Sequence, residues 1–230
     1  MSKRERIMII TDSVSMPRQN VKYEDTWIYL FKNRFMEFDV IDRPARGSTS
    51  MRLVQEGGGG FDLLELYTPD RVILQQGLAE CAPRLFKKNG FEKKFINTYL
   101  PAKIRSDYIK AVKAKRGRNP EFTDVNHIQF RYNVSNFAER CAKLNVKLAI
   151  IKILKPTDLY LSKSPFIKQN IDLYNSIYHE ISERYDNVTI IDPVKPDIDV
   201  NLICLDELHI NSEGHKLYFK EVENYFKKVK

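Results

Sequence analysis

Short apolar runs recur along the chain and are separated by stretches with helical periodicity. Each run is almost continuously apolar at its centre, which is typical of a parallel strand covered on both faces. The runs are Arg6 to Thr11, Met36 to Asp42, Arg71 to Gln75, Val146 to Leu154, and Val188 to Asp192. They predict five strands of one parallel sheet.

Between these runs, large apolar side chains repeat at three- and four-residue spacing, which predicts amphipathic helices. The repeats are Tyr23, Trp27, Phe31 and Phe35; Val134, Phe137, Cys141 and Leu144; Ile167, Ile171, Tyr174, Tyr178 and Ile181; and Tyr218, Val222 and Tyr225. We interpret them as core-facing stripes rather than as contacts to a cofactor. Strands that alternate with helices predict an α/β fold, a three-layer α/β/α sandwich around the sheet.

Two stretches interrupt this alternation. The sequence GGGG, residues 57–60, predicts a flexible link on the approach to the third strand. Residues 84–121 are far longer than an ordinary βα loop of ~2 to 6 residues, and RSDYIKAVKAK within them favours helix. We interpret residues 84–121 as an insertion into a single domain of residues 1–230, and we expect it to lie over the carboxyl edge of the sheet.

Length and composition narrow the class of protein. The chain has 230 residues, of which 43% are hydrophobic, and this suits one domain with a large core. No apolar run approaches the ~18 to 20 residues that span a bilayer, and the run after the basic start MSKRER is too short for a secretory signal. Three widely spaced cysteines, at positions 81, 141 and 204, predict free buried thiols. We therefore expect a cytoplasmic protein.

The net charge of +8 is concentrated in the insertion. Between Arg84 and Arg118 there are twelve Lys or Arg residues and only two acidic residues, Glu92 and Asp107. Such a block is either a solvated surface or a binding surface for an anionic partner. Candidate partners are an acidic glycan, a phosphate-linked sugar and an anionic membrane surface. Nucleic acid is disfavoured, because base stacking needs a defined groove that this sequence does not indicate.

The first predicted strand ends in the sequence TDS, residues 11–13. Asp12 and Ser13 are either the cap of a short helix or the setting of a nucleophile, since ligand crevices in open α/β sheets lie outside the carboxyl ends of the strands. Near the C-terminus, Asp206 and His209 precede a helix capped by Asn211 or Ser212. Ser13, His209 and Asp206 are therefore candidates for the nucleophile, general base and orienting acid of a catalytic triad.

The order of four segments resembles that of the SGNH/GDSL hydrolases. The segments are TDS after the first run, Gly47 after the second, GLAE after the third, and DELH near the C-terminus. The resemblance implies a flavodoxin-like SGNH fold in which the backbone N–H groups of Ser13 and Gly47 form an oxyanion hole. Without it, Gly47 is equally well an ordinary turn glycine. No metal-ligand spacing or nucleotide-binding glycine motif occurs, so we expect no metal and no cofactor.

Two positions depart from the family pattern. Thr11 stands where the GDS motif has glycine, and Ala79 stands where the family has an asparagine that completes the oxyanion hole. Loss of one such donor costs ~2.7 to 4 kcal/mol of transition-state stabilisation. Either Gln76, Arg84 or a substrate group replaces the amide, or the enzyme is slow. Arg18 and Arg84 are candidates to hold an anionic substrate, although each could instead pair with an acidic residue of the protein.

The segment GLAECAPRLF resembles the third block of a subgroup associated with bacterial surface-polysaccharide gene clusters. This resemblance implies a serine esterase, a carbohydrate O-deacylase, that acts on a sugar-containing, anionic ester in bacterial polysaccharide metabolism. An O-acyltransferase differs only in the acceptor of the acyl group. The alternative from another class is a non-catalytic, polyanion-binding module of the same fold. The sequence indicates no oligomeric state.

Overall fold

The computed structural model describes residues 4–87, 90–116 and 118–228, without the side chains of Lys115 and Arg116. Its centre is a five-stranded sheet in the order β2-β1-β3-β4-β5, with every pair of neighbouring strands parallel. The strands are β1 (Arg6–Thr11), β2 (Asp39–Pro44), β3 (Arg71–Gln75), β4 (Lys147–Ile151) and β5 (Val188–Ile191). This is the flavodoxin-like strand order, and it confirms the predicted parallel sheet.

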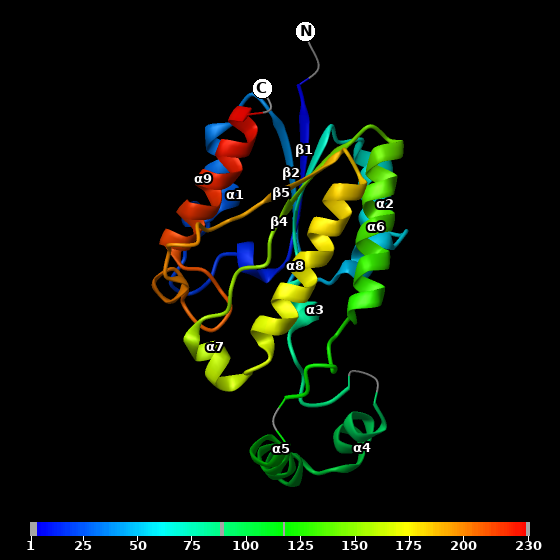
Figure 1. Cartoon of the computed structure of the whole chain (residues 1–230), viewed down its shortest axis with the longest axis vertical. Helices are drawn as coiled ribbons and strands as arrows, with labels where there is room; N and C mark the ends of the chain where they lie inside the picture. The colour runs from blue at the N-terminus through cyan, green and yellow to red at the C-terminus, as the bar shows by residue number, and fades with distance from the viewer. Residues whose placement is uncertain (1–3, 88–89, 117, 229–230) are drawn as a thin grey trace.

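Helices cover both faces of the sheet (Figure 1). One face carries α1 (Trp27–Arg34) and α9 (Ser212–Lys228), and the other carries α2 (Gly60–Tyr67), α6 (His127–Lys143) and α8 (Ile167–Arg184). The other described α-helices are α3 (Leu78–Cys81), α4 (Phe91–Tyr99), α5 (Ala102–Arg116) and α7 (Asp158–Lys163). The predicted three-layer sandwich is therefore confirmed. No helix within the described ranges is both long enough and apolar enough to cross a lipid bilayer.

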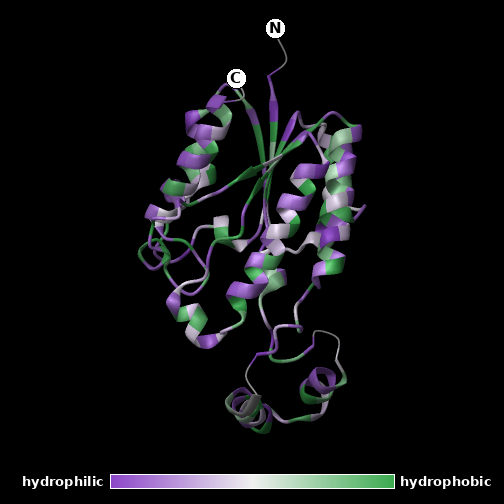
Figure 2. Ribbon diagram, in the orientation of Figure 1, coloured by the Kyte–Doolittle hydropathy of each residue, from purple (hydrophilic) through white to green (hydrophobic). Residues whose placement is uncertain are grey.

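Successive residues of the central strands alternate between two cores, as the period of a strand requires. Met8 and Ile10 of β1 pack into the core beneath α6 and α8. Ile7 and Ile9 pack into the core beneath α1 and α9, with Trp27. Figure 2 shows the apolar residues along the strands and on the inner faces of the helices. Burial on both faces explains why these strands appear in the sequence as unbroken apolar runs.

Two strands differ in extent from their apolar runs. β2 begins at Asp39 rather than Met36, because Phe35 ends α1 and its carbonyl accepts the N–H of Phe38 at 3.1 Å in a turn. As the edge strand, β2 is also half-exposed rather than covered on both faces. β4 ends at Ile151. Beyond it, the N–H of Ile153 donates to the side chain of Asn175 (2.9 Å) instead of to a neighbouring strand.

The helix boundaries correct three details of the predicted pattern. Tyr23 precedes α1 in a 3₁₀ turn, and the helix begins only after Thr26, which caps its first turn. Leu144 follows the last turn of α6 and is exposed. The GGGG stretch is not a separate link, because Gly60 is the first residue of α2. A Cβ at Gly60 would lie 2.3 Å from the carbonyl oxygen of Leu53, so only glycine fits there.

The insertion of residues 84–121 contains the expected helical segments, α4 and α5. The chain leaves and returns side by side, since the N–H of Asn119 donates to the carbonyl of Arg84 at 2.9 Å. α4 and α5 form a lobe at the end of the molecule opposite the two termini, the end toward which the carboxyl ends of the parallel strands point (Figure 1). The insertion therefore extends from the edge of the sheet where we expected it, although its helices line none of the cavities described below.

The three cysteines are free thiols, as the sequence predicts. Cys81 and Cys141 are buried, and Cys204 is partly buried. Burial raises the pKa of the Cys204 thiol to about 12. These thiols are therefore protonated and packed against the core, rather than being poised for redox chemistry.

Candidate active site

Ser13 lies immediately beyond the central strand β1. The N–H of Asp12 still pairs with the carbonyl of Gln75 on β3 (3.0 Å), and the chain then turns into the 3₁₀ segment Ser13–Ser15. The carboxylate of Asp12 accepts the N–H of Val14 at 2.9 Å. The interpretation of Asp12 as a cap is therefore confirmed. Asp12 caps a short turn, and that turn presents the hydroxyl of Ser13 at the carboxyl edge of the sheet.

The carboxyl group of Asp12 is almost completely buried. Burial raises its pKa to about 7, although the Val14 N–H and the positive charge of Arg18 oppose this shift. Asp12 is therefore only partly ionised near neutral pH. It lines the same cavity as Ser13, but it is engaged with the backbone of the turn.

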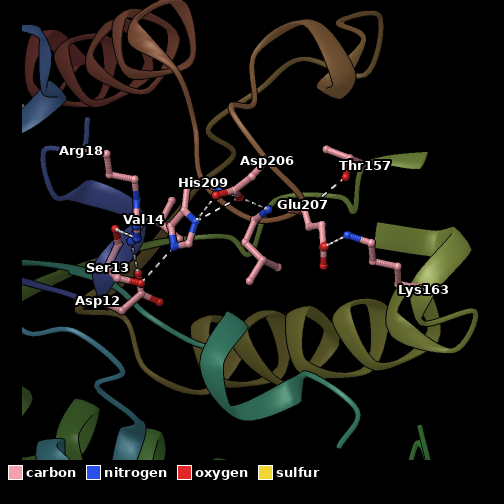
Figure 3. A network of polar contacts seen from close by, with 10 residues as sticks. Asp12, Ser13, Val14, Arg18, Thr157, Lys163, Asp206, Glu207 and His209 are labelled. Atoms are coloured by element: carbon pink, nitrogen blue, oxygen red, sulfur yellow. Dashed lines mark hydrogen bonds and ion pairs between the residues drawn. The ribbon is translucent and has the colours of Figure 1, made fainter. Parts of the chain in front are cut away.

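His209 lies between Ser13 and Asp206 (Figure 3). Its Nε2 is 3.3 Å from the Oγ of Ser13. Its Nδ1 is 2.9 Å from Oδ2 of Asp206 and 3.0 Å from Oδ1. The structure thus brings together the three residues that the sequence proposes as a triad, in the order serine, imidazole, carboxylate.

The segment that carries the histidine is held by the same aspartate. Oδ1 of Asp206 accepts the backbone N–H groups of Leu208 (2.8 Å) and His209 (2.9 Å). Asn211 then accepts the N–H of Gly214 at 3.0 Å and caps α9. One carboxylate therefore closes the turn and also orients the imidazole.

The electrostatics favour an ionised Asp206 and a neutral His209 at neutral pH. Burial opposes ionisation of Asp206, but the N–H groups of Leu208 and His209 and the imidazole together hold its pKa below the usual value. Burial lowers the pKa of His209; Asp206 opposes this shift, and the charges of Arg18 and Arg46 add to it. A neutral imidazole next to a serine hydroxyl is in the correct state to accept its proton.

Ser13 and His209 open onto a cavity of about 220 Å³, which Gly47 and Ala79 also line. Gly47 has a φ of +68°, a left-handed conformation that favours glycine. Within the described part of the chain, no acceptor takes the backbone N–H of Ser13 or Gly47. Both groups therefore remain available to an oxyanion, which is the role that the family resemblance assigns to them.

The third segment, GLAE, begins with a glycine that the packing requires. Gly77 has a φ of +115°, and a Cβ there would lie 2.5 Å from Cδ1 of Ile153. Two residues later, Ala79 lines the cavity and brings no polar side chain to it. Its carbonyl accepts a hydrogen bond from Nη2 of Arg84 at 2.7 Å.

Of the two predicted substrate-binding residues Gln76 and Arg84, only Arg84 lines the cavity. Gln76 is buried, does not line this cavity, and donates from Nε2 to Oγ of Ser48 at 2.7 Å. This corrects the expectation that it contacts substrate, because packing under the loop after β2 withdraws its amide from the cavity. Arg84 does line the cavity, but it is also ion-paired with Asp124.

Two further arginines line the cavity, Arg18 and Arg46. Arg18 was expected there, and its Nη2 donates to the carbonyl of Ser13 at 3.3 Å. Arg46 is not among the predicted site residues, although it immediately precedes Gly47 in the loop after the second strand. Arg46 is exposed and has no ion-pair partner among the described residues. The cavity is therefore cationic.

Glu80 is a second residue that the sequence reasoning missed. It is completely buried, and its carboxylate accepts the N–H (3.0 Å) and the hydroxyl (2.7 Å) of Ser50. Asn133 of α6 donates to the same hydroxyl at 3.0 Å. The one sequence feature that could have pointed to Glu80 is its place as an acidic residue at the end of the segment GLAE. Glu80 ties that segment to the loop that carries Gly47, and burial raises its pKa to about 7.

A second cavity and the buried His215 lie apart from Ser13, His209 and Asp206. In the described ranges, no three His, Cys, Asp or Glu residues gather as metal ligands would. A cavity of about 260 Å³ at the ends of β4 and β5, with Lys155, His179 and Lys195 in its walls, does not include the triad. His215 is buried, its Nδ1 accepts the N–H of Trp27 at 3.2 Å, and burial lowers its pKa to about 4. It is a packed residue rather than a ligand.

Comparison with known proteins identifies the fold. No protein-family model matches the sequence, and no curated protein matches it. Among solved structures, the chain resembles a lipase/acylhydrolase from Enterococcus faecalis (TM-score 0.64, 15% identity, covering 98% of this chain and 96% of the other). It also resembles the psychrotrophic esterase EstA from Pseudoalteromonas sp., solved with monoethylphosphonate as inhibitor (0.56, 18%, 98% of each chain).

A third similar structure is a catalytic mutant of an acetylxylan esterase from Geobacillus stearothermophilus (TM-score 0.61, 11% identity, covering 97% of this chain and 94% of the other). At these identities the likeness establishes the fold, which is that of the SGNH hydrolases.

Proposed function

We propose that this protein is a serine esterase that removes acyl groups from a sugar-containing, anionic ester. The proposal rests on one observation, the chain of contacts from Ser13 through His209 to Asp206. A serine hydroxyl is a weak nucleophile without an adjacent base, and a base is most effective when a third group fixes its tautomer. Ser13 and His209 line a cavity that opens to solvent, and Asp206 contacts His209 from behind it.

In the first step, Nε2 of His209 accepts the hydroxyl proton of Ser13 as Oγ attacks the ester carbonyl. The carbonyl oxygen becomes an oxyanion, which the N–H groups of Ser13 and Gly47 stabilise. The bond from the carbonyl carbon to the sugar oxygen then breaks while His209 donates the proton to that oxygen, so that the sugar leaves as an alcohol and an acyl group stays on Ser13. In the second step, His209 activates a water molecule, which releases the acid and regenerates the serine.

The anionic substrate is proposed from the charge of the cavity. Arg18, Arg46 and Arg84 line it together with the nucleophile, and a guanidinium is suited to a carboxylate or phosphate through paired hydrogen bonds. Arg84 already pairs with Asp124, so Arg18 and Arg46 supply most of the free positive charge. The acetylxylan esterase among the similar structures supports a carbohydrate ester as the acyl donor, and we place the reaction in bacterial polysaccharide metabolism on the sequence resemblance alone.

A fluorophosphonate probe tests the proposal, because it labels only an activated serine. We expect the wild-type protein to be labelled and to hydrolyse p-nitrophenyl acetate, and Ser13→Ala and His209→Ala to do neither. The matched control is Ser182→Ala, which removes a half-buried serine hydroxyl from α8, away from the cavity, and should behave as wild type. Labelling that persists in Ser13→Ala would refute the assignment.

The same experiment separates the alternatives. If added sugar acceptors take the acyl group faster than water does, the enzyme is an O-acyltransferase of the same fold. If a correctly folded wild-type protein is neither labelled nor active but binds a polyanion in a salt-sensitive manner, it is a binding module and the esterase proposal fails.

A further inference from the structure

The lobe formed by α4 and α5, residues 91–116, takes no part in the proposed reaction. Figure 1 shows it as a hairpin that projects from the end of the molecule opposite the termini. The hydroxyl of Tyr108 on α5 donates to the carboxylate of Glu92 on α4 at 2.9 Å and joins the two helices. The three cavities described for this chain take none of their lining from α4 or α5.

The two helices bury very little surface. Among the described side chains of α4 only Ile96 is buried, and among those of α5 none is. Helices of this length gain most of their stability from packing an apolar face against the rest of the protein. A hairpin with almost no buried face therefore has a surface available to a partner.

That surface contains a row of aromatic rings. Phe91, Phe95 and Tyr99 lie four residues apart, which places them on one face of α4. Their side chains are 83%, 44% and 71% exposed. The ring centroids are 6.2 Å apart between Phe91 and Phe95, and 5.4 Å apart between Phe95 and Tyr99. Soluble proteins rarely expose a contiguous row of aromatic side chains to solvent. Where they do, the row usually marks a site of interaction with another molecule.

The same hairpin is rich in lysine. The described lysines of the hairpin are Lys93, Lys94, Lys103, Lys110 and Lys113. None of these five forms an ion pair with another described residue. The fitting partner therefore combines an apolar layer with a negatively charged surface.

We propose that the α4–α5 hairpin docks this protein on the surface of a lipid bilayer that contains anionic lipids. The aromatic rings of α4 would insert at the boundary between headgroups and acyl chains, and the lysines would contact the anionic headgroups. The proposal does not depend on the esterase function. A nucleic acid fits less well, because the rings pack against one another along a protruding helix instead of lining a groove in which bases could stack.

Co-sedimentation of the full-length protein with vesicles tests the proposal. We expect binding to vesicles that contain about a third phosphatidylglycerol, little binding to pure phosphatidylcholine, and weaker binding as salt is added, because the Debye length shortens. The triple variant Phe91→Ser, Phe95→Ser, Tyr99→Ser should reduce the partition coefficient at least tenfold. Its matched control, Leu66→Ser, Ile128→Ser, Tyr132→Ser, replaces three side chains that are exposed elsewhere and should bind as wild type.

A charge variant gives a second measurement that does not depend on the aromatic row. The triple variant Lys103→Gln, Lys110→Gln, Lys113→Gln should lower partitioning by about a hundredfold, since each lysine near an anionic surface is worth about fivefold. Lys22→Gln, Lys147→Gln, Lys220→Gln removes the same charge elsewhere on the surface and should have little effect. Because the hairpin buries so little, the melting temperatures of these variants should stay close to that of the wild type.

Three results would overturn the proposal. The first is no binding of the wild-type protein to the phosphatidylglycerol vesicles at low salt. The second is an equal loss of binding in the hairpin variants and their controls. The third is a dimer, detected by light scattering without lipid, that the aromatic variant dissociates; the row would then be covered by a second copy of the chain.

Discussion

The guanidinium of Arg18 donates a hydrogen bond from Nη2 to the backbone carbonyl of Ser13 at 3.3 Å. The loop that carries Arg18 is closed by two backbone hydrogen bonds with Val21, at 2.9 and 3.0 Å. A fixed positive charge therefore lies against the proposed nucleophile. Together with Arg46, it also lowers the pKa of His209, so the charge of the cavity and the protonation of the base are coupled.

This coupling predicts the pH dependence of an arginine variant. His209 acts as a base only when neutral, so kcat/KM falls as pH drops below its pKa. Arg46→Gln removes a positive charge that lowers this pKa, and the acidic limb of the pH profile should therefore move to higher pH. The measurement is kcat/KM for a neutral ester across pH 4 to 9, with Arg4→Gln, at an exposed arginine away from the cavity, as control. A limb that stays in place in Arg46→Gln would show that Arg46 does not influence the base.

Arg46→Gln should also weaken the binding of an anionic substrate. The KM for an ester with a carboxylate or phosphate should rise about tenfold, which corresponds to the loss of one charge-assisted hydrogen bond of ~1.5 kcal/mol or slightly less. The KM for a neutral ester of the same alcohol should change little. An equal change for both esters would contradict an anionic substrate.

Two substitutions of Asp206 separate its role toward His209 from its role in the turn. Asp206→Asn keeps an oxygen that can accept the N–H groups of Leu208 and His209, so the variant should fold and melt normally. It should nevertheless lose up to about 10⁴-fold in kcat, because the amide no longer fixes the tautomer of the imidazole. Asp206→Ala should lose activity and also about 1 kcal/mol of stability. Parallel losses of melting temperature and activity in Asp206→Asn would instead indicate a purely structural residue.

Ala79 offers a test by gain of function. It lines the cavity beside Ser13, at the position where the family resemblance expects an oxyanion donor. Ala79→Asn should raise kcat about tenfold or more, because one such amide is worth about 10²- to 10³-fold where it is native. Ala79→Leu, similar in size but without an amide, should not. An unchanged kcat in a folded Ala79→Asn would mean that another group, such as Arg84, already serves this role.

The buried carboxyl of Glu80 predicts how stability depends on pH. Its pKa is raised from 4.5 to about 7 in the folded protein, so the folded state binds the proton more tightly than the unfolded state. The contribution of Glu80 to the free energy of unfolding therefore falls as pH rises between about 4.5 and 7, by roughly 3 kcal/mol in total. Glu80→Gln should remove about this much of the difference between pH 5 and pH 8, measured by denaturant unfolding. The exposed Glu183→Gln should not; a wild-type slope retained in Glu80→Gln would contradict the raised pKa.

The sequence alone determined the layers of the fold and the identity of the triad candidates. Burial on both faces of a parallel strand leaves an unbroken apolar run, and packing of a helix leaves a repeat of three and four residues; both are local patterns that survive in the sequence. Phe31, Tyr178 and Tyr218 are all buried as their spacing indicated. Errors occurred at element ends, where a single turn hydrogen bond, such as that from Phe38 to Phe35, decides the boundary.

Only the tertiary structure decided which polar side chains meet. Ser13 and His209 are 196 positions apart, and their approach depends on the register of strands and on the turn that Asp206 closes. Gln76 and Arg46 also show that tertiary packing decides whether a polar side chain reaches the cavity. Both follow strands that end at the same edge of the sheet, yet packing buries Gln76 against Ser48 and leaves Arg46 in the cavity wall. A local pattern cannot specify such outcomes, because the contacts that direct these side chains come from segments distant in sequence.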